Sequence, residues 1–348
     1  MYFTLYDRNF SSIGKTYILE DWKRTRRAID FDEASITGEQ IPYSAEPFFV
    51  VVNNNKGHAI FSGLASTPDI DEDKKKTSIV LKDYTTLFNS DIVVNWSNFS
   101  GTTVSDLLLF IFNLWKTQNG SVGFTNLSID VSSIQNIPIT IPLGSDKESV
   151  LTYTLIHDCM LWYNLWCDPI LNVASKSLTF KFRPAASYTI DIRLKDFGLQ
   201  GFKKSFGDFN QVTIYDYTYT KQQTWVLTAD NSVVSLPTLK DLVYPMKNRN
   251  FVAEEPGDNL TETDAINNAV YEAVMALAEN RYQEELVLDL NSHNTVEQLK
   301  EADFSTSVRV YTEDGLYKTL PVGEIYTDSK ENRTLTIGYR VQELTQEL

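Results

Sequence analysis

The chain has 348 residues, of which 42% are hydrophobic and 22% are charged, so it is long enough for two to four compact units with cores of their own. No apolar run approaches the length that crosses a membrane, and Met1-Tyr2-Phe3-Thr4 does not open a signal peptide. We therefore expect no membrane insertion. The formal net charge of −15 argues against a protein that grips nucleic-acid phosphates, but not against one that DNA slides past.

Residues 1–101 predict a small β module. Tyr2–Leu5 has the pattern of a short strand, and Asn9–Lys15 that of a loop. Phe48–Val52 and His58–Leu64 flank a polar, Gly-closed turn, which predicts a hairpin, and Thr77–Leu81 predicts a third strand.

Two charged segments interrupt this module. Lys23-Arg24-Thr25-Arg26-Arg27 is followed by Asp30, Asp32 and Glu33, which favours a strip of ion pairs within or between subunits over a nucleic-acid patch. Asp69–Lys76, with acids followed by lysines, predicts an exposed hairpin loop. The acid excess is concentrated in Glu254–Asp289, which holds ten acids and one base (Arg281), and a solvated face is the simplest interpretation of that segment.

Residues 102–199 predict an inserted α/β domain. Thr103 and Asp106 fit a capping box for a helix that ends at Asn119-Gly120. Val150–Trp166 predicts a second helix, apolar almost all round, which Asp168-Pro169 ends. Cys159 and Cys167, eight positions apart on this helix, would be roughly 12 Å apart at about 1.5 Å per residue, too far for a disulfide. A hairpin over Ile170–Phe182 follows.

The last part predicts a second β module over 221–348, with a helix at 262–282. The strand Asn210–Tyr219 is expected to complete the first module by about 200–220, and Gln223–Val234 predicts a further hairpin. Either Thr261 or Thr263 fits the helix cap. Four strands are expected after the helix, with an Asp-Gly turn between the second and third: Glu285–Leu290, Val308–Tyr311, Leu316–Ile325 and Thr334–Tyr339.

The two modules follow one order: strand, Gly-closed turn, strand ending near a glycine (Gly63, Gly323), polar loop, strand. We interpret this as one β unit present twice. The expected fold class is thus α+β and multidomain, with two small β-barrel-like tube modules and an inserted or adjoining α/β domain.

Known catalytic and nucleotide-binding motifs are absent from the sequence: there is no GxxxxGK[ST], GxGxxG, GxSxG or HExxH. His157-Asp158-Cys159 stands together, but neighbours on a helix point in different directions. Acid pairs such as Glu254-Glu255 are too common in this chain to indicate a hydrolase. The row Tyr215-Tyr217-Tyr219 is either one face of a strand or a sugar platform. We expect no catalytic, cofactor-binding or metal-binding residues.

Several short motifs now fall in a familiar order. They are Trp22 to Arg27, Phe61-Ser62-Gly63, Lys82-Asp83-Tyr84, Asn210-Gln211-Val212, Arg281-Tyr282, Pro321-Val322-Gly323 and Leu335-Thr336-Ile337-Gly338. In this order the chain resembles the tail-associated hub proteins of siphophages and prophages of Gram-positive bacteria, particularly the short Listeria-prophage type. These are similar to the baseplate hubs of contractile phages and of phage Mu.

The resemblance implies a structural, non-enzymatic homotrimer at the tip of the virion tail, made in the host bacterial cytoplasm. Its three subunits would give a six-part ring that closes the tail tube and opens for DNA passage. Implied partners are the distal tail protein, the tail tube or tape-measure protein, and tail fibre or receptor-binding proteins, with DNA only in passage and no cofactor. Lumen-lining residues are expected at Asp69, Asp71, Glu72 and Asp73.

Two other functions stay open from the sequence. One is a receptor- or polysaccharide-binding tail protein that uses exposed Trp and Tyr side chains. The other is a tail-borne cell-wall hydrolase, which the end of the chain at Leu348 without an added lytic domain makes the weaker alternative.

Overall fold

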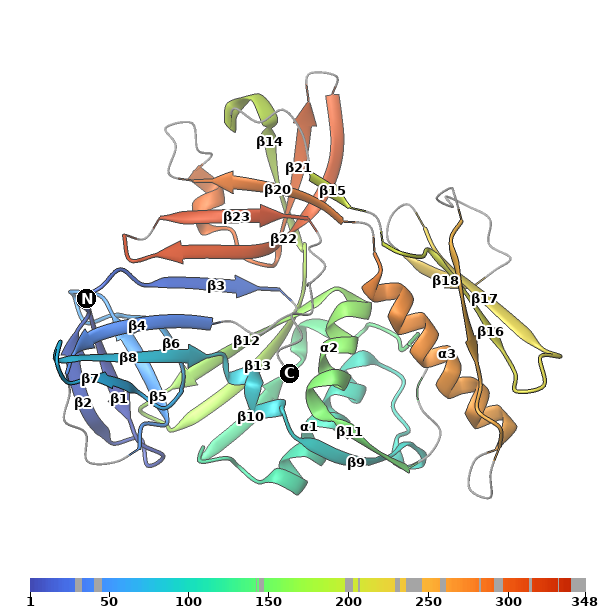
Figure 1. The fold of residues 1–348 in the computed structure, drawn as a ribbon, viewed down its shortest axis with the longest axis horizontal. Coiled ribbons are helices and arrows are strands. Elements are labelled where there is room, and N and C mark those ends of the chain that lie inside the picture. Colours follow the sequence, from blue (N-terminus) through green and yellow to red (C-terminus); the bar gives the residue numbers. More distant parts are fainter. Residues whose placement is uncertain are drawn as a thin grey trace.

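We analysed a computed structural model, which describes residues 1–28, 33–40, 46–141, 143, 147–197, 203–205, 207–228, 232–235, 246–256, 261–281, 283–290, 297–312, 315–330 and 332–338. In this part the fold is mostly β, with three α-helices and four sheets. Figure 1 shows the strands of the largest sheet side by side, with the helices to one side of it.

The largest sheet contains two groups of strands. The first module consists of β1 (Tyr2–Tyr6), β2 (Ser12–Tyr17), β3 (Lys23–Arg27), β4 (Glu33–Glu39), β5 (Phe49–Asn53), β6 (Ala59–Ala65), β7 (Asp69–Asp71) and β8 (Lys76–Lys82). The second module consists of β14 (Tyr188–Arg193), β15 (Lys203–Ser205), β20 (Gln283–Asp289), β21 (Thr306–Thr312), β22 (Gly315–Asp328) and β23 (Arg333–Ile337).

The two modules repeat one strand order. In the first, neighbouring strands run β4-β8-β6-β5-β1, and in the second they run β20-β23-β22-β21-β14. Taken along the chain, β1, β4, β5, β6 and β8 therefore correspond to β14, β20, β21, β22 and β23. One difference remains, because β1 lies antiparallel to β5 whereas β14 lies parallel to β21. The predicted repeat of hairpin, loop and third strand is confirmed.

Each module has its own core, because alternate residues of its strands face inward. Phe3, Trp22, Ile36 and Val52 belong to the first core, and Leu288, Val308, Leu320 and Leu335 to the second. At roughly 25 cal/mol per Å² of apolar surface, such burial is the main stabilising term for each module. The two cores remain separate although the sheet is continuous.

No sheet closes on itself within the described residues, so the expected barrels are not shown. The first module comes nearest to closure where Ile18 forms a single bridge with Gly38 on β4. A Cβ on Gly38 would lie 2.6 Å from a ring carbon of Phe3 and 2.6 Å from the Thr16 methyl carbon. The strands can approach this closely only because residue 38 has no side chain.

A helical unit packs beside the first module. Its elements are β9 (Asp91–Asn95), α1 (Val104–Asn119), β10 (Asn126–Asp130), β11 (Lys147–Leu151), α2 (Thr152–Tyr163), β12 (Leu165–Asn172) and β13 (Ser177–Pro184). The predicted capping box is confirmed, because the Asp106 backbone N–H donates to the Thr103 hydroxyl and the Thr103 backbone N–H donates to the Asp106 carboxylate. Gly120 ends α1 with a φ of 78°.

The second predicted helix is shorter than expected. It ends at Tyr163, because Asn164 adopts the left-handed conformation with a φ of 51°. Trp166 and Cys167 therefore belong to β12, and Asp168-Pro169 lies within that strand. Cys159 on α2 and Cys167 on β12 are both free thiols.

A four-stranded sheet forms the last unit, with β16 (Gln211–Tyr215), β17 (Gln222–Leu227), β18 (Val233–Ser235) and β19 (Asn248–Val252). The helix α3 (Glu262–Glu279), capped by Thr261, packs on this sheet through Ala269, Ala273 and Val274. We expected β16 to complete the first module and the helix to belong to the second, but β16 pairs with β17 and β19.

Two smaller expectations also differ. The segment Asn9–Lys15, predicted as a loop, enters β2 at Ser12. The tyrosine row leaves the sheet after Tyr215, and Tyr219 lies in a turn with a φ of 57°. The turn of the predicted hairpin Gln223–Val234, at 229–231, and the last residue of the predicted strand Thr334–Tyr339 fall outside the described residues.

Candidate functional site

On β4, β8, β3 and β22, the face of the joined sheet opposite the two cores carries exposed or half-buried polar side chains. On β5 the same face is covered, because Phe49 and Val51 pack in the core of the helical unit. Along β4 the side chains of Ala34 and Ile36 are buried in the first core, whereas Glu33, Ser35 and Glu39 are exposed. The neighbouring strand β8 alternates in the same way, with Thr77 and Ile79 inward and Val80 and Lys82 exposed. This period of two marks a half-buried sheet with one wet face. We call it the polar face.

The polar face continues from the first module into the second through β3. On one edge β3 pairs with β4, and on its other edge it pairs with β22, both antiparallel. Lys23 lies opposite Asp328, Thr25 opposite Tyr326, and Arg27 opposite Glu324. Figure 1 shows β3 between β22 and β4, with their axes aligned. We call the β3–β22 ladder the seam.

Acids outnumber bases on the described polar face. The acids, placed by their pairing, are Glu33, Glu39, Asp69, Asp71, Glu285, Asp289, Glu324 and Asp328. The bases placed in the same way are Lys23, Arg27, Lys76, Lys82 and Lys203, the last opposite Glu285. A face with this balance repels a polyanion at long range.

The basic run that forms β3 points to both sides of the sheet. Arg24 and Arg26 face inward, where Arg24 stacks on Phe61 of the first core at 5.0 Å and Arg26 on Phe304 of the second at 5.4 Å. Arg26 also lies 3.8 Å from the Asp168 carboxylate. One strand thus contacts both cores through cation–π interactions, which favour arginine.

On the polar side of the seam, Arg27 Nε lies 3.2 Å from the Glu324 carboxylate. The expectation of ion pairs within the chain is confirmed, although the acids are Glu324 and Asp168. Asp30 and Asp32 fall outside the described residues. The sequence missed the seam because its two strands are nearly 300 residues apart. The signal it did offer is the alternation of Arg24 and Arg26 with Lys23, Thr25 and Arg27.

Asp83 lies just behind the seam, at the start of the short helix η1 (Tyr84–Phe88). Burial raises the pKa of Asp83, against the effect of hydrogen bonds from Thr85 and of the Arg24 and Arg26 charges. The Thr85 backbone N–H donates to this carboxylate at 2.7 Å and the Thr85 hydroxyl at 2.6 Å. Asp83 therefore caps η1, and its carboxylate also interacts electrostatically with Arg24 and Arg26.

The acidic loop falls at the end of the polar face. Asp69 and Asp71 belong to β7 and lie opposite Ser78 and Lys76. Asp71 accepts hydrogen bonds from the Lys74 backbone N–H at 2.9 Å and from the Lys74 ammonium at 3.0 Å, and these hydrogen bonds lower its pKa. Glu72 and Asp73 are exposed in the turn. The structure thus places two of the four expected residues on the polar face and two beyond its edge.

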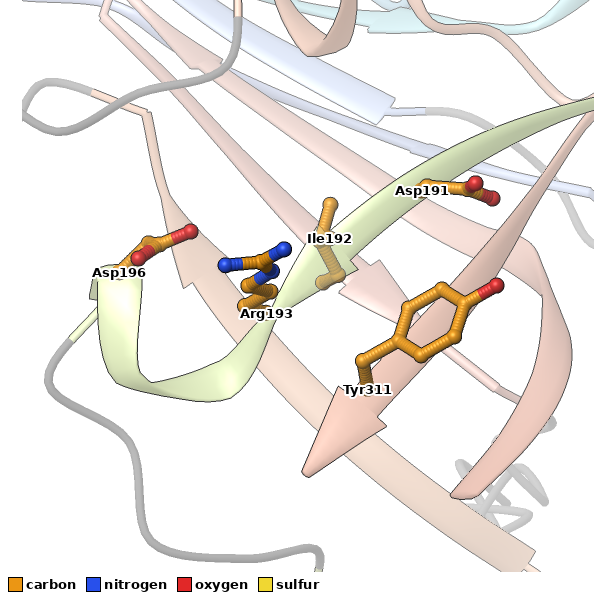
Figure 2. A pocket seen from close by; sticks show the side chains of 5 residues that line it. All are labelled: Asp191, Ile192, Arg193, Asp196 and Tyr311. Carbon is orange, nitrogen blue, oxygen red and sulfur yellow. The ribbon is translucent and has the colours of Figure 1, made fainter. Parts of the chain in front are cut away.

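A small cavity of about 280 Å³ lies at the far end of the second module, between β14, β21 and the short helix η4 (Leu194–Phe197). Figure 2 shows its lining, which is Asp191, Ile192, Arg193, Asp196 and Tyr311. The Asp191 carboxylate lies 2.8 Å from Arg309 Nε, so this acid is engaged in an ion pair. The described lining holds no nucleophile beside a base of the kind that acyl transfer requires.

The His157-Asp158-Cys159 cluster is not arranged for catalysis. Asp158 is buried and accepts a hydrogen bond from the Tyr271 hydroxyl, while His157 Nδ1 lies 3.6 Å from the Asp158 carboxylate. Cys159 is buried in the helical core, and burial and the neighbouring Asp158 raise its thiol pKa. A thiol kept protonated is a poor nucleophile.

Among the residues that the structure describes, no group of three or more His, Cys, Asp or Glu side chains is placed to hold a metal ion. In the same residues, no helix has the length and apolar character needed to span a membrane.

Comparison with known proteins finds relatives by structure alone. No family model matches the sequence, and no curated protein sequence matches it. The prophage tail protein gp18 of Listeria monocytogenes EGD-e is 14% identical, with a TM-score of 0.50 over 98% of this chain and 95% of that one. The 43 kDa tail protein of prophage MuSo2 from Shewanella oneidensis is 11% identical, with a TM-score of 0.50 over 98% of each chain.

The chain has the fold of these prophage tail proteins. A chain of the phage P2 baseplate in its activated conformation with Ca is also similar, at 12% identity and a TM-score of 0.49 over 97% of this chain and 98% of that one. The two neighbours with a TM-score of 0.50 are both prophage tail proteins, matched over nearly their full length. At these identities the likeness concerns the fold.

Proposed function

We propose that the chain is a structural subunit of a phage tail, and that three copies form the hub at the tail tip. The observation that carries this proposal is the continuous sheet, in which two modules of one strand order are joined by the seam. Three copies of such a chain supply six similar units, and a ring of six can dock on a sixfold tail. The shared fold with prophage tail proteins supports the same function.

In this hub the polar face lines the channel. A wall for DNA passage must not bind phosphates, because each neutralised phosphate adds affinity through counterion release. An excess of carboxylates over bases, of which Arg27 and Lys76 are engaged in ion pairs, meets this need. Asp69 and Asp71 lie in this wall, and Glu72 and Asp73 at its rim.

The remaining parts are assigned to contacts outside the channel. The helical unit from β9 to β13 supports the first module from outside the channel, because Phe49 and Val51 of β5 pack in its core. Distal tail protein, tube or tape-measure protein, and fibre or receptor-binding proteins are the partners expected at a tail tip. The hub closes the tube before infection and opens for DNA, and the chain performs no catalysis.

Electron microscopy tests this placement. Tailed particles of the phage or prophage that encodes the chain are labelled with an antibody raised against it. We expect label at the distal end of the tail, opposite the capsid. Label on the capsid, label along the tail shaft, or a chain that is lacking from purified particles contradicts the proposal.

A further inference from the structure

The seam pairs β3 with β22 within one chain. The corresponding position in the second module has a strand like β3, but the outer edge of that strand has no partner among the described residues. In the first module, Lys23, Arg24 and Thr25 of β3 pair antiparallel with Ser35, Ala34 and Glu33, the first three residues of β4. In the second module, Lys203, Lys204 and Ser205 of β15 pair antiparallel with Glu285, Glu284 and Gln283, the first three residues of β20. Both β4 and β20 have seven residues. The strand β15 thus repeats the position of β3.

The outer edges of these two strands differ. That of β3 is occupied by β22, whose residues Glu324–Asp328 follow directly after Gly323. The outer edge of β15 pairs with no further strand among the residues that the structure describes. An unpaired strand edge is a template for adding another strand.

The strand that corresponds to β22 is β6 of the first module, where Gly63 takes the place of Gly323. A Cβ on Gly63 would lie 2.8 Å from the Lys82 carbonyl oxygen, and one on Gly323 2.4 Å from the Gly338 carbonyl oxygen. In both cases the clash is with backbone near the end of the third strand of the module. Residues 64–68 are then the counterpart of Glu324–Asp328.

The edge of residues 66–68 is half used. On one edge, the Ser66 backbone N–H donates to the Val80 carbonyl of β8 at 2.9 Å. On the other edge, pairing with the β5 segment reaches only as far as Ala65, whose backbone N–H donates to the carbonyl of Phe48, the residue before β5. Beyond that point the edge away from β8 pairs with no described strand. The strand β22 changes partner at the same place. It pairs with β21 as far as Pro321 and with β3 of the first module from Glu324 onward.

The charges of the two half-formed edges are complementary. The sequence of β15 contains Lys203 and Lys204, and the segment after Pro68 is Asp69-Ile70-Asp71-Glu72-Asp73. The completed seam has the same polarity, because basic β3 lies against Glu324 and Asp328 of β22. Asp69, Glu72 and Asp73 are exposed.

We infer that β15 of one copy pairs antiparallel with residues 66–68 of a second copy, and so repeats the seam between subunits. This is a head-to-tail contact, which forms a closed ring if the rotation per subunit is one third of a turn. The inference rests on the proposed trimeric hub and names the backbone contact that closes it. The ring then alternates seams within chains and seams between chains.

Disulfide crosslinking of the full chain tests this contact. By correspondence with Arg24 and Thr327, which lie opposite each other, Lys204 meets Thr67. Antiparallel partners are about 4.5–5.5 Å apart at Cα, within the disulfide range of about 4.4–6.8 Å. We expect the variant Thr67→Cys/Lys204→Cys to give reducible species of two and three chain masses after mild oxidation. Ser66→Cys/Ser205→Cys, one step along the ladder, provides a second pair.

The controls separate this inference from the hub itself. Each single variant reports any crosslink to Cys159 or Cys167, and Thr67→Cys/Val252→Cys combines Thr67 with an exposed residue of β19, in a different sheet. Light scattering gives the native mass. A mass of three chains without a crosslink in either pair overturns this contact and leaves the hub standing. A mass of one chain overturns both, and equal crosslinking through Val252→Cys also overturns the contact.

Discussion

At the scale of single residues, two glycines show a physical constraint that the two modules share. Gly63 and Gly323 share almost no sequence context, yet each lies against a backbone carbonyl at the end of the third strand of its module. A carbonyl oxygen cannot turn aside as a flexible side chain can. The common constraint is therefore close approach of two backbones, which only glycine allows.

We predict that Gly63→Ala and Gly323→Ala each lower the free energy of unfolding. The added methyl carbon would lie 2.8 Å from the Lys82 oxygen or 2.4 Å from the Gly338 oxygen, and forced overpacking costs about 1–3 kcal/mol. Urea unfolding measures the change, with Thr67→Ala, an exposed site, as control. A neutral result at both glycines would contradict the equivalence of the two strands.

Another residue-scale prediction concerns Asp216, which organises the turn after β16. Its carboxylate accepts from the Lys221 and Thr220 backbone N–H groups at 3.0 and 2.7 Å and from the Thr218 and Thr220 hydroxyls. These hydrogen bonds, that from the Lys221 backbone first, lower its pKa to about 2. A lowered pKa means that the ionised form stabilises the fold above the ordinary value of 3.8 and that this stability is lost as the pH falls toward 2.

We therefore expect Asp216→Asn to melt at a lower temperature than the unsubstituted chain at pH 7. The difference shrinks between pH 4 and pH 2, where the wild-type carboxylate becomes protonated. Melting curves across this range test it, with Asp208→Asn as a control on an exposed acid. A difference that does not depend on pH would mean that the charge of Asp216 contributes nothing to the turn.

At the scale of elements, local signals were sufficient where a short segment determines its own structure. The capping box of α1, the Thr261 cap of α3 and the strands of both hairpins were predictable because caps, turns and periodicity act within a few residues. The strand β2 was missed because its sequence, Ser12–Tyr17, buries little and has no clean alternation. The end of α2 depends on one left-handed asparagine, Asn164.

Pairing across long sequence distances could not be predicted in this way. The strand β16 forms within the expected segment, although its three central residues are all buried. Nothing in its sequence indicates that its neighbours are β17 and β19. The seam poses the same problem, since the paired residues of β3 and β22 are nearly 300 positions apart in the sequence. For the candidate site, the sequence thus predicted charged segments, and the topology decides which of them share a face.

We predict a measurable coupling across the seam between Arg27 and Glu324. Their ion pair is 3.2 Å long, with 40% of the Arg27 side chain and 13% of the Glu324 side chain exposed. A pair this open to solvent contributes about 0.2–1 kcal/mol. A double-mutant cycle with Arg27→Ala and Glu324→Ala measures this energy, which we expect to fall at high salt.

The matched control is the pair Lys74 and Asp71, which is more exposed and lies within one hairpin. Its disruption should leave the unfolding transition of the joined sheet unchanged. Additivity of the Arg27 and Glu324 substitutions, with no coupling at any salt concentration, would show that this ion pair does not stabilise the seam.

At the scale of the whole molecule, a face with an acid excess runs through both modules. Each acid alone is an ordinary surface residue. Together they give a continuous wall, because the seam aligns the outward side chains of β4, β3 and β22 on one side of the sheet. Part of the net charge of −15 therefore lies on the surface that we assign to the channel.

We predict that reversing this charge makes the polar face bind duplex DNA. The variant Glu33→Lys/Glu39→Lys/Asp69→Lys changes three exposed acids of the face and should bind DNA in gel-shift assays at about 0.05 M salt, where phosphate contacts are strong. Its affinity should fall steeply with salt, as counterion release requires. The control Glu254→Lys/Glu255→Lys/Glu301→Lys has the same net charge, but its three exposed acids lie outside the joined sheet. Equal DNA binding by both variants would mean that net charge, and not the placement of acids on this face, keeps the unsubstituted chain from binding DNA.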